Sequence, residues 1–201
     1  MCSSSWRAVR LVAVCSGLIL AATATIATQH RSDVLRIPAP EPRSFEVALD
    51  ELVIEAPSPE FPLASGRVPS DVTLGLRRGR LVSATVANAG SIYGLVLAGR
   101  RMRAAFPGVD FALVLYDAGA PRTPATRALL TREVGLILDS NQTPGTLVSP
   151  SVEVRAVPGV PGAFVARAAD PLAAVELAKL LHGKPGVRSA YPLLKRQEFP
   201  R

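Results

Sequence analysis

Both cysteines of this 201-residue chain, Cys2 and Cys15, lie within its first 27 residues. Those residues have the pattern of an export signal, and a chain that has lost them contains no thiol. Neither a disulfide nor a cysteine metal site can then hold the fold together. Hydrophobic residues make up 48% of the chain and charged residues 19%, which is enough apolar material to bury a core. Packing alone must therefore stabilise the mature protein.

The export segment begins with the basic residues Arg7 and Arg10, followed by an apolar run over residues 11–21. Small residues come next and offer signal cleavage sites at Ala24 and Ala27, the usual order in a secretory signal peptide. An uncleaved anchor is the alternative, because the apolar stretch approaches the roughly 17–25 residues that span a bilayer. We expect a secreted or periplasmic protein that has no membrane contact after signal removal.

The net charge of +7 raises the question of a nucleic-acid partner. Proteins that bind nucleic acid have basic residues interleaved with aromatic ones, on which the bases stack. Aromatic residues make up only 5% of this chain and do not lie beside its arginine clusters. The sequence therefore predicts no nucleic-acid binding.

The mature chain begins with a proline-rich segment. Prolines are densest between Pro38 and Pro69, which predicts an irregular region over residues 28–69 with one apolar strand at 45–54. Residues 70–125 are expected to form a small α+β region, whose elements follow in order. They are a hairpin over 72–86, a helix over 91–106, a buried strand over 109–116 and a short helix capped by Thr123.

Residues 126–201 have a regular alternation of elements. The pattern predicts a strand at 133–139, a loop at 140–151, strands at 152–157 and 163–168, a helix ending at 181 and a strand at 187–193. Asp170 is the expected N-cap of that helix, with Pro171 at its first position and Gly183 beyond its end. This order predicts a ferredoxin-like α+β domain in the C-terminal half, without its first helix and preceded by the smaller strand-rich region.

Two stretches of this half resemble the end of the propeptides of bacterial subtilisin-like serine peptidases. They are Asp170-Pro-Leu-Ala-Ala-Val-Glu-Leu-Ala-Lys-Leu-Leu181 and Pro185-Gly-Val-Arg-Ser-Ala-Tyr-Pro192. In that family a helix rich in Leu, Ala and Glu precedes a Pro-Gly-Val strand, which leads into the catalytic domain. The resemblance covers roughly residues 114–201.

The resemblance implies a folding assistant and inhibitor whose partner is a subtilisin-like catalytic domain, bound in cis or in trans. The family's tail lies in the substrate cleft as an extended strand, a case of β-augmentation. The matching peptidase-binding residues here would be Tyr191, Pro192, Leu193, Leu194, Lys195 and Arg196.

No catalytic site is expected in the chain itself. The Asp-Ser/Thr-Gly, His-Gly-Thr and Gly-Thr-Ser motifs of a subtilisin triad are incomplete at residues 139–141, 182–184 and 145–147, and a triad works only as a set. Two histidines, His30 and His182, are too few for a metal cluster. We therefore predict a non-enzymatic protein with no cofactor and no metal.

Two other interpretations remain open from the sequence. One is a stand-alone exported inhibitor that docks on a peptidase in trans. The other, from a different class, is a structural or envelope-associated protein.

Overall fold

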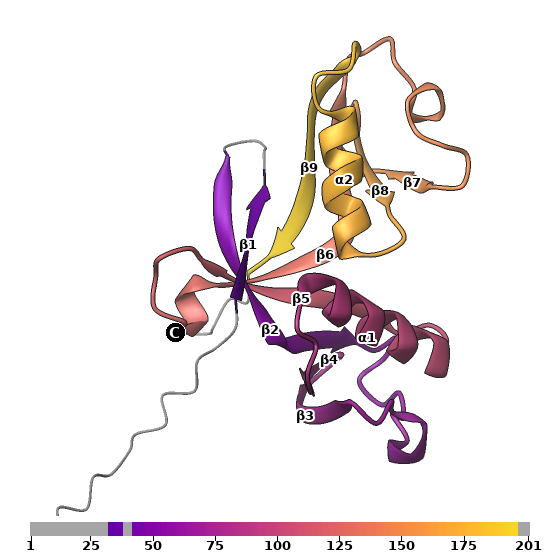
Figure 1. Cartoon of the computed structure of the whole chain (residues 1–201). Coiled ribbons are helices and arrows are strands. Elements are labelled where there is room, and N and C mark those ends of the chain that lie inside the picture. The colour runs from indigo at the N-terminus through magenta and orange to yellow at the C-terminus, as the bar shows by residue number, and fades with distance from the viewer. Residues whose placement is uncertain (1–31, 38–41, 197–201) are drawn as a thin grey trace, which may run out of the picture.

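The computed structural model describes residues 32–37 and 42–196, so the predicted export signal, with Ala24 and Ala27, lies outside the described residues. The described residues form one nine-stranded antiparallel sheet with two α-helices packed against one of its faces (Figure 1). The strands are β1 (Ser32–Ile37), β2 (Arg43–Glu55), β3 (Val72–Arg78), β4 (Leu81–Val86), β5 (Asp110–Asp117), β6 (Arg127–Leu138), β7 (Glu153–Ala156), β8 (Ala163–Arg167) and β9 (Val187–Lys195); the helices are α1 (Ile92–Ala105) and α2 (Pro171–Leu181).

The sheet is made of two copies of one unit, which consists of a long strand, a hairpin, a helix and a closing strand. In the first repeat (43–117) the strand order is β3-β4-β2-β5, and in the second repeat (127–195) it is β7-β8-β6-β9. The long strand of each repeat carries an irregularity at the same place. In β2 the pairing with β5 shifts between Val47 and Leu52, and in β6 the pairing with β9 shifts between Leu130 and Val134.

The two repeats are joined through their shared middle strands. Leu113–Tyr116 of β5 pair with Arg127–Leu130 of β6, so the closing strand of the first repeat continues the sheet into the long strand of the second. β1 pairs with the first part of β2 as β5 pairs with the first part of β6. The result is a single sheet rather than two separate domains.

The prediction of a ferredoxin-like α+β domain preceded by a smaller region is therefore wrong. β6 begins at Arg127, well before the strand expected at 133–139, and this early part joins both halves of the chain into one sheet. The short helix expected after Thr123 is only a 3-10 turn at Pro124–Thr126. The residues that follow it, 128–130, are good helix formers by themselves, but pairing with β5 holds them extended because tertiary context overrides propensity.

Most of the local predictions are confirmed. The strand expected at 45–54 is β2, the hairpin over 72–86 is β3 and β4, and the helix expected over 91–106 is α1. The loop at 140–151 contains only a 3-10 turn. The Asp170 carboxylate caps α2 by accepting from the Ala173 N–H at 2.9 Å, as Ser91 caps α1.

Each repeat buries its helix against its own strands, and the two cores meet. α1 contributes Leu95 and Met102 to a cluster with β2, β4 and β5, and Val175 of α2 belongs to the same cluster. A second cluster joins α2 to β6, β8 and β9 and includes Leu136 and Leu181.

One buried carboxylate connects the two helices. The side chain of Asp170 is 1% exposed, and it accepts from the guanidinium of Arg100 on α1 as well as from the α2 backbone. Arg103 of α1 donates to the Ala169 carbonyl at 2.8 Å. The C-terminal half of α1 is thus tied to the start of α2.

We expect Asp170→Ala to lower the free energy of unfolding by about 1–2 kcal/mol, because it removes a helix cap. Loss of the ion pair with Arg100 adds to this cost. Urea unfolding measures the change. Asp170→Asn keeps an oxygen that can cap α2 and should cost less. Arg100→Met leaves the cap in place and removes only the ion pair. Equal stability of Asp170→Ala and the native chain would contradict this role.

Candidate functional site

The sheet face that points away from the helices differs between the two repeats. In the first repeat the part of this face on β2 and β5 is buried in a cluster with Leu129 of β6, made of Ala48, Val53, Ala112, Val114, Tyr116 and Leu129. Part of the cover comes from the segment 118–126, in which the Arg122 guanidinium lies 5.3 Å from the centre of the Tyr116 ring. Pro124 of the same segment lines a cavity together with Val53. The chain thus covers the second face of its own first repeat.

Burial has an electrostatic consequence at Tyr116. Desolvation of its phenol, together with the nearby Glu51 carboxylate, raises the pKa of Tyr116 above its usual value, although Arg127 and Arg122 act in the opposite direction. The hydroxyl lies 3.5 Å from Glu51 Oε1. The neutral phenol is therefore the form that this face accommodates.

Strand pairing identifies the matching positions in the second repeat. Val53 pairs with Ser83 and Ala112, as Gly135 pairs with Val165 and Tyr191. Because neighbouring residues of a strand point to opposite faces, the buried Val134 and Leu136 face α2, and Gly135 faces away from it.

We call the face formed by Gly135, Ile137, Val165, Tyr191 and Leu193 the open face. Its four side-chain-bearing members are half-buried, and none belongs to a buried cluster of the described residues. A Cβ on Gly135 would lie 2.9 Å from the Tyr191 ring and 3.2 Å from Leu193, so both side chains lie across the glycine. The Tyr191 ring can pack directly over residue 135 because glycine has no side chain there.

Ion pairs border the open face. Arg155 of β7 meets Glu133 of β6 at 3.0 Å, and Arg167 of β8 meets Glu153 of β7 at 3.5 Å. An apolar strip with a charged rim is the usual composition of a protein–protein contact surface.

The residues predicted to form a peptidase-binding tail are part of the sheet. Tyr191 to Lys195 lie in β9, where the Leu193 carbonyl accepts from the Thr131 hydroxyl at 3.2 Å. Tyr191 and Leu193 belong to the open face, Pro192 is buried, and Leu194 packs against the core of the first repeat. Lys195 pairs with Glu55 at 3.2 Å, and Arg196 pairs with Asp117 at 3.0 Å. Their binding to a peptidase stays a prediction.

Sequence reasoning found the closing strand of the second repeat but not the repeat itself. A signal was present: of the three Pro-Gly-Val stretches in the chain, those at 107–109 and 185–187 each link a helix to the closing strand, and the one at 158–160 lies between β7 and β8. Both glycines have positive φ, 88° at Gly108 and 83° at Gly186, a conformation that favours glycine.

Across residues 32–37 and 42–196, no group of three His, Cys, Asp or Glu side chains is arranged to hold a metal ion. No helix in the described part of the chain is long and apolar enough to cross a membrane. Comparison with protein-family models, with curated proteins and with solved structures finds no match.

The packing of the Tyr191 ring over Gly135 can be tested by adding one methyl group at position 135. Gly135→Ala should destabilise the chain by about 1 kcal/mol, because the new Cβ forces the ring from its place. Gly145→Ala, where a Cβ would meet nothing within 4 Å, should be neutral or slightly stabilising. Denaturant unfolding of both variants checks the contrast, and the same effect at both positions would refute it.

The raised pKa of Tyr116 predicts a loss of stability in alkali. The unfolded chain gives up the phenol proton near its ordinary pKa of about 10, and the folded chain does so only at a higher pH. The stability that the neutral Tyr116 phenol contributes is complete below about pH 10 and is lost as the pH rises through the pKa of the folded state. Tyr116→Phe should remove this part of the pH dependence in urea unfolding. A stability difference between native chain and variant that is constant with pH would contradict it.

Proposed function

We propose that this chain is an exported, non-enzymatic partner of a subtilisin-like serine peptidase, acting as its pro-region or as an inhibitor in trans. In either role it assists folding of the peptidase and blocks its activity. One observation carries the proposal: among the described residues, the face that β2 and β5 bury in the first repeat is only half-buried at the matching positions of the second repeat.

The residues that resemble peptidase propeptides belong to this second repeat. The stretch 170–181 is the capped helix α2, and the stretch 185–192 leads into and forms most of β9. α2 packs against one face of β6, β8 and β9, which leaves the open face as the available contact surface of the same strands. The proposal rests on these residues and this face, and it does not require a ferredoxin-like fold.

The open face has the side chains that a stable contact needs. Tyr191 offers a large ring with a polar hydroxyl, a residue type enriched at the energetic centres of interfaces. Ile137, Val165 and Leu193 surround it with aliphatic surface. When a partner covers these half-buried groups, the burial of their apolar surface favours binding by about 25 cal/mol per Å².

Two of the predicted tail residues would contact the peptidase through the open face, and the end of the chain would enter the cleft. Lys195 and Arg196 have exposed side chains, 47% and 46%, in their pairs with Glu55 and Asp117. Exposed pairs of this kind are worth about 0–1 kcal/mol each. Giving up these two ion pairs to contact a peptidase would therefore cost little.

Inhibition assays with a charge placed on the open face test the proposal. The chain should inhibit members of a panel of subtilisin-like peptidases, and Val165→Arg should weaken inhibition by about tenfold or more, since it buries an unpaired charge at the contact. The matched control is Leu180→Arg, on the outer side of α2, where the leucine is 66% exposed. The control should inhibit as the native chain does.

Two results would overturn the proposal. One is no inhibition of any peptidase in the panel by excess native chain. The other is equal weakening by Val165→Arg and Leu180→Arg in chains of native stability, which would place the contact elsewhere.

A further inference from the structure

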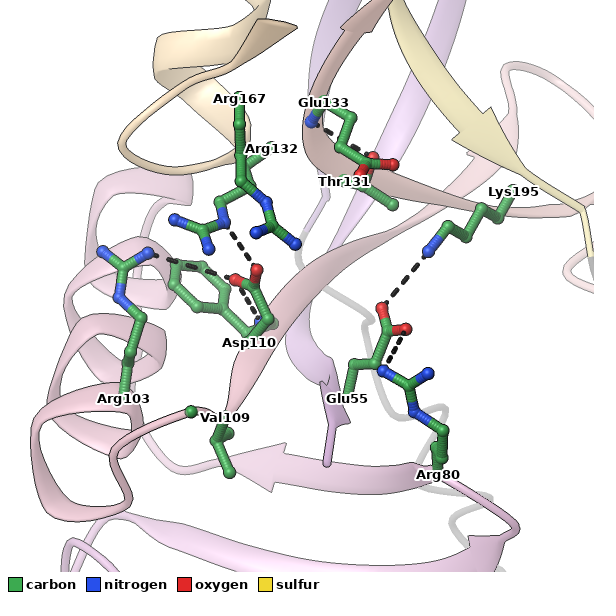
Figure 2. A pocket seen from close by; sticks show the side chains of 12 residues that line it. Glu55, Arg80, Arg103, Val109, Asp110, Thr131, Arg132, Glu133, Arg167 and Lys195 are labelled. Atoms are coloured by element: carbon green, nitrogen blue, oxygen red, sulfur yellow. Dashed lines mark hydrogen bonds and ion pairs between the residues drawn. The ribbon is translucent and has the colours of Figure 1, made fainter. Parts of the chain in front are cut away.

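A cavity of about 290 Å³ lies between the two repeats, at the point where β5 and β6 separate (Figure 2). β5 pairs with β6 only from Leu113 onward, while Asp110 to Ala112 pair with β2 alone. From Glu133 onward β6 pairs with β8 instead. We call the cavity in this fork the notch.

Basic side chains dominate the lining of the notch. Five basic residues and three acidic ones line it, an excess of two positive charges: Arg80, Arg103, Arg132, Arg167 and Lys195 against Glu55, Asp110 and Glu133. The partners just outside the lining, Arg155 of Glu133 and Glu153 of Arg167, add one charge of each sign. The excess of two positive charges remains.

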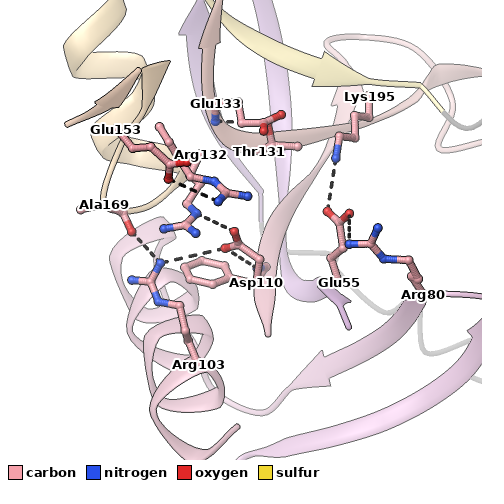
Figure 3. Close-up of polar contacts among 12 residues, drawn as sticks. Glu55, Arg80, Arg103, Asp110, Thr131, Arg132, Glu133, Glu153, Ala169 and Lys195 are labelled. Carbon is pink, nitrogen blue, oxygen red and sulfur yellow. Dashed lines mark hydrogen bonds and ion pairs between the residues drawn. The ribbon is translucent and has the colours of Figure 1, made fainter. Parts of the chain in front are cut away.

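Two of the three acidic groups of the notch are each shared between two cations, and the third, Glu133, pairs with Arg155. Asp110 accepts from Arg132 and lies 4.0 Å from Arg103, and its other oxygen also accepts from the Phe111 N–H at 3.0 Å (Figure 3). On the opposite side, Glu55 pairs with Arg80 at 3.4 Å and with Lys195 at 3.2 Å. Two carboxylates thus serve four cations.

Hydrogen-bond donors remain available in the notch. A guanidinium has five N–H donors, and within the described part of the chain Arg132 donates only through Nε, to Asp110. The guanidinium groups of Arg103, Arg132 and Arg167 gather around Asp110 in Figure 2. A concave site with low-dielectric walls focuses the field of such groups and concentrates anions.

We propose that the notch binds a small oxyanion with at least two negative charges, carried by phosphate or by paired carboxylates. Planar guanidinium groups match both, because they donate two parallel N–H bonds to neighbouring oxygens. Bound there, the anion neutralises the excess charge and bridges β6 and β8 of the second repeat to α1 and β5 of the first. The notch adjoins the open face, because Glu133 and Arg167 line the one and border the other. Binding of the anion does not require a peptidase partner.

Calorimetric titration of the full chain with inorganic phosphate, and separately with succinate, tests the proposal at constant ionic strength set with sodium chloride. We expect saturable binding of one anion per chain for at least one of the two, and the pair of titrations distinguishes the phosphate source from the carboxylate source. Arg167→Gln, at a side chain 41% exposed, should weaken binding by about tenfold or more, the usual loss of a charged hydrogen bond. Lys195→Gln should weaken it in the same direction.

The control is Arg188→Gln, which removes the same charge from an exposed position of β9 that does not line the notch. It should bind as the native chain does. The proposal is overturned if neither anion binds beyond the effect of chloride. It is also overturned if Arg188→Gln weakens binding as much as Arg167→Gln, because general charge would then explain the effect.

Discussion

The two helices are held to each other through the buried carboxylate of Asp170. Among the described residues, Asp170 and Thr131 are the polar side chains that are buried, and only Asp170 is charged. A buried carboxylate needs partners to offset its desolvation, and here it has the first turn of α2 and the guanidinium of Arg100 from α1. These contacts tie the helix of one repeat to the helix of the other on one face of the sheet, which is continuous because β5 pairs with β6.

The two repeats share one backbone plan and differ on one face of the sheet. The pairing of both long strands shifts at the same point. In both helices the side chain of the N-cap residue accepts from the backbone N–H three residues further along the chain. The side chains on the second face diverge, however. Val53 belongs to a buried cluster in the first repeat, and Gly135 accommodates the half-buried Tyr191 ring at the matching position of the second.

Local elements could be predicted from the sequence, and their assembly could not. The cap at Asp170, the helix that begins near Ser91 and the apolar alternation of β3 and β4 are signals within a few residues, which periodicity and capping chemistry reveal. The extended conformation of residues 128–130 depends on β5, a partner that the local sequence does not specify. The repeat also remained hidden because the two copies share little beyond Pro-Gly-Val. Strand alternation indicates that Tyr191 and Leu193 share a face, but it does not indicate which faces the chain covers.

The proposed contact between the open face and a subtilisin-like peptidase can be tested by methyl NMR of the chain, titrated with a peptidase whose nucleophilic serine has been replaced. We expect the methyl signals of Ile137, Val165 and Leu193 to shift or broaden on binding, while those of Leu180 on the outer side of α2 stay in place. Changes centred on Leu180, or none at the open face in a complex that forms, would contradict it.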